Sequence, residues 1–307
     1  MLKQSLWGLF AIALSCALLF QSCGGSDNLR VDNAPVETTG QTTGQTTALE
    51  QEHQGDTPTP TPVAMAEPSV PVTGKEIVYA TIEGQSITGY LAQPETLEAE
   101  NQASEPLPAI ITIHEWWGLN DNIKAMTRRL AGEGYTVLAV DLYSSKVATD
   151  PAEARDLMRT VMDNPGWAQE NLFQASQFLT ETYSAPAIGS IGWCFGGNWS
   201  LRTGLLLDGL DAIAIYYGQL ILSAEALDGL DMPIIGFFGA DDSSIPVQDV
   251  ENFESILANL GKTADIHLYP GVGHAFANPS GQNYNAEAAE DAWQKTTAFF
   301  ATHLKSS

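Results

Sequence analysis

Six residues near the middle of the chain, Gly192-Trp193-Cys194-Phe195-Gly196-Gly197, constrain its fold more than any other stretch. They form a Gly-X-nucleophile-X-Gly turn with a cysteine at the centre, which is the pattern of a nucleophile elbow between a strand and a helix. The flanking glycines allow a strained backbone at Cys194, and the N–H groups of the following helix favour its thiolate form. The alternative is a buried, inert core cysteine, which the glycine pattern disfavours.

Apolar segments and helix-compatible segments alternate along the chain from about residue 75. A hairpin is expected around Glu83-Gly84, because alternating apolar residues flank this pair. The expected strands after it cover residues 108–114, 135–140, 187–193, 212–217, 233–238 and 264–269. The expected helices cover residues 122–132, 151–164, 169–183, 195–207, 247–260 and 287–304. This alternation predicts an α/β fold with a mostly parallel sheet and helices on both faces.

The N-terminus predicts an export signal over residues 1–23. Lys3 precedes an apolar run over residues 6–20, which is too short to span a bilayer comfortably. The run leads into Gln21-Ser22-Cys23-Gly24-Gly25, which resembles a bacterial lipoprotein processing site with Cys23 as the lipidated residue. An ordinary signal peptide and an uncleaved anchor are the alternatives. We expect an exported protein tethered to a membrane, either in the periplasm or on the cell surface.

Residues 24–73 predict a flexible linker between this signal and a folded domain over residues 74–307. The linker is dominated by Thr, Gln, Gly, Pro and acidic residues, so it cannot bury a core of its own. His53 lies within it, and the sequence suggests no function for this residue. The expected arrangement is a globular domain held away from a membrane surface.

The composition excludes several classes of partner. The net charge of −24, from 13 basic and 37 acidic residues, makes a nucleic acid an unsuitable ligand, because phosphate binding requires clustered Lys and Arg. No His and Cys cluster has metal-ligand spacing and no dinucleotide-binding fingerprint occurs, so we expect neither a metal nor a cofactor. We expect the domain to be monomeric.

The cysteine count favours a catalytic thiol. If Cys16 is removed with the signal and Cys23 is lipidated, Cys194 is the one remaining thiol and no internal disulfide can form. A free thiol in an exported protein is exposed to oxidation, and catalysis would explain why it is kept. A redox function is disfavoured because no resolving cysteine lies nearby.

A candidate acid and a candidate base follow two later strands. Nucleophile, acid and histidine then occur along the chain in the order that is typical of folds with this kind of elbow. His274 follows the strand over residues 264–269, where it could take the proton of Cys194. Asp242 follows the strand over residues 233–238, completes a Gly-X-X-Asp pattern from Gly239, and could orient the imidazole. Asp241 remains an alternative acid, and both aspartates could instead form a turn. His267 and His303 are interpreted as structural.

Several motifs together make the chain resemble the dienelactone hydrolase family of α/β hydrolases. The resemblance covers residues 75–304 and implies the α/β-hydrolase fold. It rests on His114-Glu115-Trp116-Trp117-Gly118-Leu119-Asn120, Asp141-Leu142-Tyr143, the elbow at Cys194, the Asp242 turn and Gly273-His274-Ala275-Phe276.

The resemblance implies a catalytic triad of Cys194, His274 and Asp242, with Glu115 as a fourth participant that holds the resting thiol. A structural role for Glu115 in its loop is the alternative. The oxyanion would be bound by backbone N–H groups of Trp116 and Phe195. Residues that would face the substrate are Trp117, Tyr143, Ser145 and Asn278, although the tryptophans could equally belong to the core.

Two positions depart from the family. Its well-characterised members bind the substrate carboxylate with two arginines, at the places that Ser145 and Asn278 occupy here. Lys146 is adjacent to one of them, but it lacks the forked geometry of arginine. Dienelactone is therefore a doubtful substrate, and a neutral or differently anchored ester or lactone fits better.

The sequence thus predicts a hydrolase of activated esters or lactones that acts through a thioester on Cys194. Two alternatives remain, a catalytically silent, surface-tethered binding protein with the same fold and a redox thiol protein.

Overall fold

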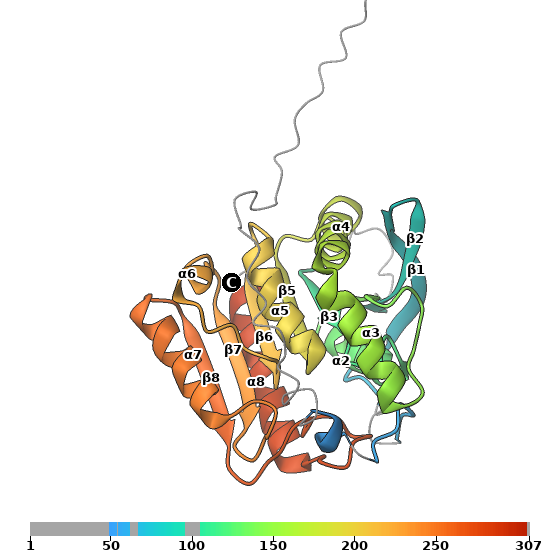
Figure 1. Ribbon diagram of the computed structural model, residues 1–307. Helices are drawn as coiled ribbons and strands as arrows, with labels where there is room; N and C mark the ends of the chain where they lie inside the picture. Colours follow the sequence, from blue (N-terminus) through green and yellow to red (C-terminus); the bar gives the residue numbers. More distant parts are fainter. Residues whose placement is uncertain (1–48, 54, 62–66, 96–104, 306–307) are drawn as a thin grey trace, which may run out of the picture.

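The computed structural model describes residues 49–53, 55–61, 67–95 and 105–305, and it shows an eight-stranded sheet with helices on both faces (Figure 1). The spatial order of the strands is β1-β2-β4-β3-β5-β6-β7-β8. Their bounds are β1 Val72–Ile82, β2 Gln85–Pro94, β3 Ala109–Ile113, β4 Thr136–Val140, β5 Ile188–Trp193, β6 Ala212–Tyr216, β7 Ile234–Gly239 and β8 Ala264–Tyr269. The expected export signal, including Cys16 and Cys23, lies outside the described residues.

The sheet is mostly parallel, as the sequence predicts. Strands β3 to β8 pair in parallel, whereas β2 is antiparallel to both β1 and β4. The hairpin between β1 and β2 turns at Glu83 and Gly84, whose φ angles are 51° and 80°. Strand β1 begins at Val72, two residues before the expected domain boundary at residue 74.

Helices cover both faces of this sheet. Their bounds are α2 Asp121–Gly132, α3 Pro151–Asp163, α4 Pro165–Tyr183, α5 Phe195–Leu206, α6 Ala224–Leu227, α7 Val247–Asn259 and α8 Ala286–Leu304. A Cβ at Gly189 in β5 would meet Phe300 and Leu304 of α8, whereas one at Gly192 would meet Gly196 of α5. Residues three apart in a strand point to opposite faces, so α5 and α8 lie on opposite sides of the sheet.

Side-chain caps mark the start of helices α2, α3, α6 and α8. The side chain of Asn120 accepts from the N–H of Ile123 at the start of α2, and Asp150 caps α3 ahead of Pro151. Helix α4 begins at Pro165, four residues before its expected start, because proline is well suited to the first turn of a helix. The short helix α6 has no counterpart among the expected elements.

Part of the expected linker packs against the domain. Residues 49–52 form a helical turn, and Leu49 and His53 are 4% and 0% exposed. The carboxylate of Glu50 pairs with Arg155 of α3 at 2.7 Å, and that of Asp56 accepts from the N–H of Gln282 at 2.7 Å. Residues 49–53 and 55–61, which the sequence analysis assigns to the linker, therefore pack against the domain through contacts of this kind.

None of the helices within the described ranges is both long enough and apolar enough to cross a membrane.

Candidate active site

Cys194 occupies the tight turn between β5 and α5. Its φ and ψ angles are 55° and −117°, a backbone conformation that residues other than glycine rarely adopt. A Cβ at Gly192 would lie 2.0 Å from the carbonyl oxygen of Gly196, and one at Gly196 would lie 2.2 Å from that of Ile113. The elbow thus requires glycine at both positions, which is why the sequence pattern is so specific.

His274 and Asp242, the base and acid expected from the sequence, form a hydrogen bond. The Nδ1–H of His274 donates to Oδ2 of Asp242 at 2.7 Å, and both side chains are buried. The other carboxylate oxygen of Asp242 accepts from the N–H groups of Ser244 and Ile245 at 2.8 and 3.0 Å. Asp241 is exposed, so Asp242 is the aspartate that the fold brings to His274.

The free nitrogen of His274 faces the elbow. Its Nε2 is buried and has no hydrogen-bond partner among the described residues. A ring nitrogen of His274 and Sγ of Cys194 lie within 4.8 Å of each other. A small adjustment would bring the imidazole into contact with the thiol, as is common for catalytic groups without bound substrate.

The electrostatics of the site favour a thiolate. Burial alone would raise the pKa of Cys194, but the neighbouring His274 and His53 lower that pKa to about 6. Burial would lower the pKa of His274, but Asp242 and Cys194 hold it well above its ordinary value. The pair is therefore suited to exist as thiolate and imidazolium near neutral pH.

Glu115 lies at the end of β3, near Cys194. Its carboxylate accepts from Nδ2 of Asn278 at 2.8 Å and from the hydroxyl of Tyr217 at 3.4 Å. Burial, with a further contribution from the charge of Cys194, raises the pKa of Glu115 to about 7. Asn278, which the family resemblance places beside the substrate, donates to this carboxylate.

The neighbouring His114 has a structural role. Its Nδ1–H donates to the carbonyl oxygen of Glu115 at 2.6 Å, and its Nε2 accepts from the N–H of Leu142 at 3.1 Å. Burial lowers the pKa of His114, so the imidazole stays neutral between these two partners. It therefore fixes the loop that carries Glu115 against the loop after β4.

The Asp-Leu-Tyr motif shapes this second loop. The carboxylate of Asp141 accepts from the N–H groups of Tyr143, at 2.8 Å, and of Ser145. The ring of Tyr143 packs between His114 and Phe195 with centroid distances of 4.5 and 5.4 Å. Tyr143 is thereby buried in the wall behind the elbow, and Ser145 is exposed on the surface.

A cavity of about 360 Å³ opens beside the elbow and is lined by both Cys194 and His274. This volume is within the usual range for small-molecule sites. The remaining described lining residues are Leu49, Met158, Met162, Phe195, Asn198, Arg202, Tyr217, Gln219, Leu220, Ile221, Leu222, Ser223, Ser244, Ile245 and Asp249. Trp117, Tyr143, Ser145 and Asn278 are not among them, so this cavity is built from other residues than the sequence analysis expects.

Arg202 contributes a cation to this cavity. Its Nε–H donates to Oδ1 of Asn198 at 2.7 Å, and its guanidinium lies 5.6 Å from the ring centroid of Trp199. Burial lowers the pKa of Arg202, and no carboxylate of the described residues forms an ion pair with it. The sequence offers no signal for this position, because the arginine lies within a helix rather than after a strand.

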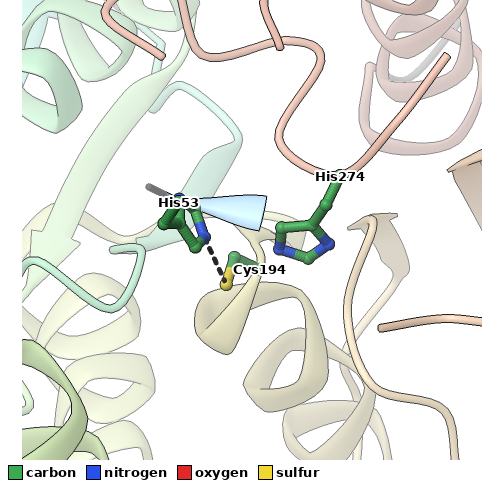
Figure 2. Close-up of side chains that lie close together, drawn as sticks. All are labelled: His53, Cys194 and His274. Carbon is green, nitrogen blue, oxygen red and sulfur yellow. Dashed lines mark hydrogen bonds between the residues drawn. The ribbon is translucent and has the colours of Figure 1, made fainter. Parts of the chain in front are cut away.

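His53 is a second residue of the site that the sequence analysis missed. Its Nε2 lies 3.9 Å from Sγ of Cys194, and its Nδ1–H donates to Asp56 at 2.8 Å. The ring stacks on Trp116 with a centroid distance of 4.4 Å and is completely buried. Figure 2 shows His53 and His274 approaching Cys194 from two sides. A His-X-X-Asp spacing within a polar stretch is the one feature that could have indicated this role.

The remaining candidates have simpler surroundings. Trp116 and Trp117 are almost completely buried and lie edge to face, with centroids 5.1 Å apart. His267 stacks on Phe237 at 5.3 Å, and His303 lies against Phe299 on the exposed end of α8. Both histidines lie outside the described lining of the cavity.

The chain is similar to several known proteins. The sequence pattern of the dienelactone hydrolase family matches residues 87–304. A protein of Saccharolobus solfataricus, provisionally named a carboxymethylenebutenolidase, is 32% identical over 263 residues, which cover 73% of this chain and 97% of that one. A protein of a Synechocystis species with the same provisional name is 34% identical over 245 residues and covers 73% and 96% of the two chains.

The fold is shared with solved structures. A crystal structure from Klebsiella pneumoniae, provisionally described as a dienelactone hydrolase, superposes with a TM-score of 0.67 at 27% identity. The match covers 76% of this chain and 100% of that one. The family pattern, the two relatives and the shared fold confirm the resemblance drawn from the sequence motifs. The chain belongs to the dienelactone hydrolase family of enzymes.

Proposed function

We propose that this protein hydrolyses activated esters or lactones through a thioester intermediate on Cys194. The observation that carries the proposal is the convergence of three features at one point. An elbow cysteine faces a cavity of suitable size, a buried histidine points its free nitrogen toward it, and a buried carboxylate holds that histidine. This is the arrangement of nucleophile, base and orienting acid that acyl transfer requires.

In the acylation step, the thiolate of Cys194 attacks the carbonyl carbon and a carbon–sulfur bond forms. The oxyanion of the tetrahedral intermediate would be bound by the N–H groups of Phe195 and Trp116, as the family resemblance implies. When the intermediate collapses, the carbon–oxygen bond to the leaving group breaks, and the imidazolium of His274 donates its proton to the departing oxygen. The product of this step is a thioester on Cys194.

In the deacylation step, His274 removes a proton from a water molecule that attacks the thioester carbon. The carbon–sulfur bond breaks, the acid product leaves, and the thiolate and imidazolium are restored. Asp242 stabilises the imidazolium in both steps because its carboxylate accepts from Nδ1. Glu115, held by Asn278 and Tyr217, places a second titratable group near the thiol and completes the site.

The leaving group and Arg202 define the substrate class. A thiolate is itself a good leaving group, so the tetrahedral intermediate collapses productively only when the alcohol is a still better one, as in enol and aryl esters. The guanidinium of Arg202 supplies a fork of donors within the same cavity as Cys194. We therefore propose an activated ester or lactone that carries an anionic group and is anchored by Arg202, rather than by the two arginine positions of the family.

The setting of the enzyme remains as the sequence suggests. We propose that residues 1–23 direct export, that Cys23 carries a lipid, and that the domain works at a membrane surface outside the cytoplasm. A binding protein without turnover is the alternative function. Retention of bound ester without release of product would favour that alternative.

Steady-state hydrolysis of a neutral aryl ester and of its carboxylate-bearing analogue tests the proposal. We expect turnover of at least one ester by the wild-type protein, and its loss in Cys194→Ala with the far-ultraviolet circular dichroism unchanged. Equal turnover by Cys194→Ala would refute the cysteine mechanism. Binding of both esters without turnover by the wild-type protein would support the silent binding protein.

A further inference from the structure

Three buried side chains present metal-binding atoms to one point in the active site. The ring nitrogens of His53 and His274 and the Sγ of Cys194 all lie within 4.8 Å of one another. We infer that these three residues form a binding site for Zn²⁺, and that the metal-bound protein is a resting state closed to esters. This inference goes beyond the proposed hydrolysis, because the ion would bind to the enzyme without taking part in turnover.

Each histidine is oriented as a metal ligand by a carboxylate. The Nδ1–H of His53 donates to Asp56 at 2.8 Å, and that of His274 donates to Asp242 at 2.7 Å. In each neutral imidazole the proton is therefore on Nδ1, and the lone pair of Nε2 is free to bind an ion. Such carboxylate–histidine pairs are typical of the groups around protein zinc sites, where they fix the tautomer and increase the basicity of the ligand.

The distances suit zinc. Zn–S and Zn–N bonds of about 2.3 and 2.0–2.1 Å at a tetrahedral angle place sulfur and nitrogen about 3.6 Å apart. The observed separation between Sγ of Cys194 and Nε2 of His53 is 3.9 Å. A movement of a few tenths of an ångström would bring these two atoms to the separation of zinc ligands, and the nitrogen of His274 lies within 4.8 Å of both.

The chemistry of the donors selects the kind of ion. One thiolate and two imidazoles suit zinc and similar transition metals, whereas Ca²⁺ and Mg²⁺ prefer oxygen ligands. A divalent cation would also offset the negative charges of the thiolate, Asp56 and Asp242, which are gathered in a buried site. Nε2 of His274, which has no partner among the described residues, would gain one.

A fourth position remains open on the cavity side. Cys194 and His274 line the cavity, so an ion can reach them from there and take a water or anion as its fourth ligand. On binding, the thiolate–imidazolium pair of Cys194 and His274 releases one proton to solvent from Nε2 of His274, and the lone pairs of Sγ and of this nitrogen are donated to the ion. The sulfur then cannot attack an ester, so zinc is expected to inhibit hydrolysis, and a chelator is expected to restore it by removing the ion.

Titration of the metal-free full chain with Co²⁺ tests the site directly, because Co²⁺ replaces Zn²⁺ and absorbs light. We expect visible absorption bands with the intensity that is typical of tetrahedral Co²⁺, together with a near-ultraviolet charge-transfer band from the thiolate to cobalt. Both should be lost when Zn²⁺ is added. The charge-transfer band should vanish in Cys194→Ala. Substitution of a carboxylate that holds a zinc-binding histidine lowers metal affinity about 10- to 100-fold, so the Co²⁺ affinity of Asp56→Asn should fall by a factor in that range. His53→Ala, which removes the ligand itself, should lose at least about a hundredfold in Co²⁺ affinity.

His303→Ala is the matched control, because it removes an exposed histidine at the end of α8 and should leave Co²⁺ affinity unchanged. Circular dichroism of His53→Ala and Asp56→Asn verifies that both variants fold. Absence of the charge-transfer band in the wild-type protein would overturn the inference. Unchanged Co²⁺ affinity in a folded His53→Ala would also overturn it, since the ion would then bind without His53. These spectra do not depend on turnover, so failure of the proposed ester hydrolysis is a separate result.

Discussion

The Nε2 atom of His53 lies 3.9 Å from Sγ of Cys194, although 141 residues separate them in the chain. The thiol at the elbow therefore meets two imidazoles, each held by its own carboxylate through Nδ1. One of these pairs, His274 with Asp242, belongs to the expected triad. The other comes from a segment that precedes the sheet and whose Leu49 also lines the cavity.

His53→Ala should raise the pKa of Cys194. His53 lowers this pKa through its contact and its charge, so its removal favours the protonated thiol. The shift should be smaller than that in His274→Ala, because His274 has the larger effect on the thiol. The measurement is the rate of alkylation of Cys194 by iodoacetamide as a function of pH, with His303→Ala as the control. An unchanged midpoint in His53→Ala would show that His53 does not act on the thiol.

The wild-type protein should be alkylated, and should turn over esters, with a rate that rises through about pH 6. The pKa of Cys194 is lowered to about 6, so the nucleophilic thiolate is populated above that pH and lost below it. The midpoint belongs to the coupled Cys194–His274 pair rather than to one group. In Asp242→Asn the imidazolium loses its carboxylate partner, so the midpoint should move upward. A midpoint near the ordinary thiol value in the wild-type protein would contradict this description of the site.

Arg202→Gln should weaken binding of a carboxylate-bearing ester and leave its neutral analogue nearly unaffected. Hydrogen bonds to charged groups contribute about 1.5–3 kcal/mol, which corresponds to a rise in KM of about ten- to a hundredfold. The comparison is made on two aryl esters with the same leaving group. A change in kcat then reflects the acyl-transfer step, and a change in KM reflects binding of the carboxylate by Arg202. Equal effects on both esters would assign Arg202 a structural role beside Asn198 and Trp199.

Gly192→Ala should destabilise the protein and abolish turnover. The new Cβ would lie 2.0 Å from the carbonyl oxygen of Gly196, so β5 or the elbow must move. Overpacking of this kind typically costs about 1–3 kcal/mol. Gly166→Ala is the matched control, because no atom lies within 4 Å of its Cβ position near the start of α4, and it should be neutral or slightly stabilising. Chemical denaturation measures both.

The sheet and the triad geometry follow from local patterns in the sequence. Alternating apolar segments locate the strands, and the glycines around Cys194 specify the elbow, because close approach of backbone leaves no room for a side chain. Asp242 and His274 are found because active residues of parallel sheets follow the ends of strands. The structure separates Asp242 from Asp241 through the 2.7 Å contact to His274, which neighbouring positions in the sequence cannot distinguish.

His53 and Arg202 show what local patterns omit. His53 lies in a stretch whose composition indicates a linker, and its burial depends on contacts with loops more than a hundred residues away, such as the bond from the N–H of Gln282 to Asp56. Arg202 lies in the interior of α5, where the sequence gives no reason to expect a substrate-facing cation. The pocket residues expected from the family resemblance do not line the cavity beside Cys194, and one of them, Asn278, binds Glu115.

Trapping of the acyl-enzyme tests the central claim most directly. Wild-type protein, Cys194→Ser and Cys194→Ala are mixed with an aryl ester, quenched in acid during turnover, and digested for mass spectrometry. We expect the wild-type peptide that contains Cys194 to gain the mass of the acyl group as a hydroxylamine-sensitive thioester, and the Cys194→Ala peptide to gain nothing. Turnover by the wild-type protein with the acyl group on another residue, or with no acylated peptide while Cys194→Ala is equally active, would contradict the account.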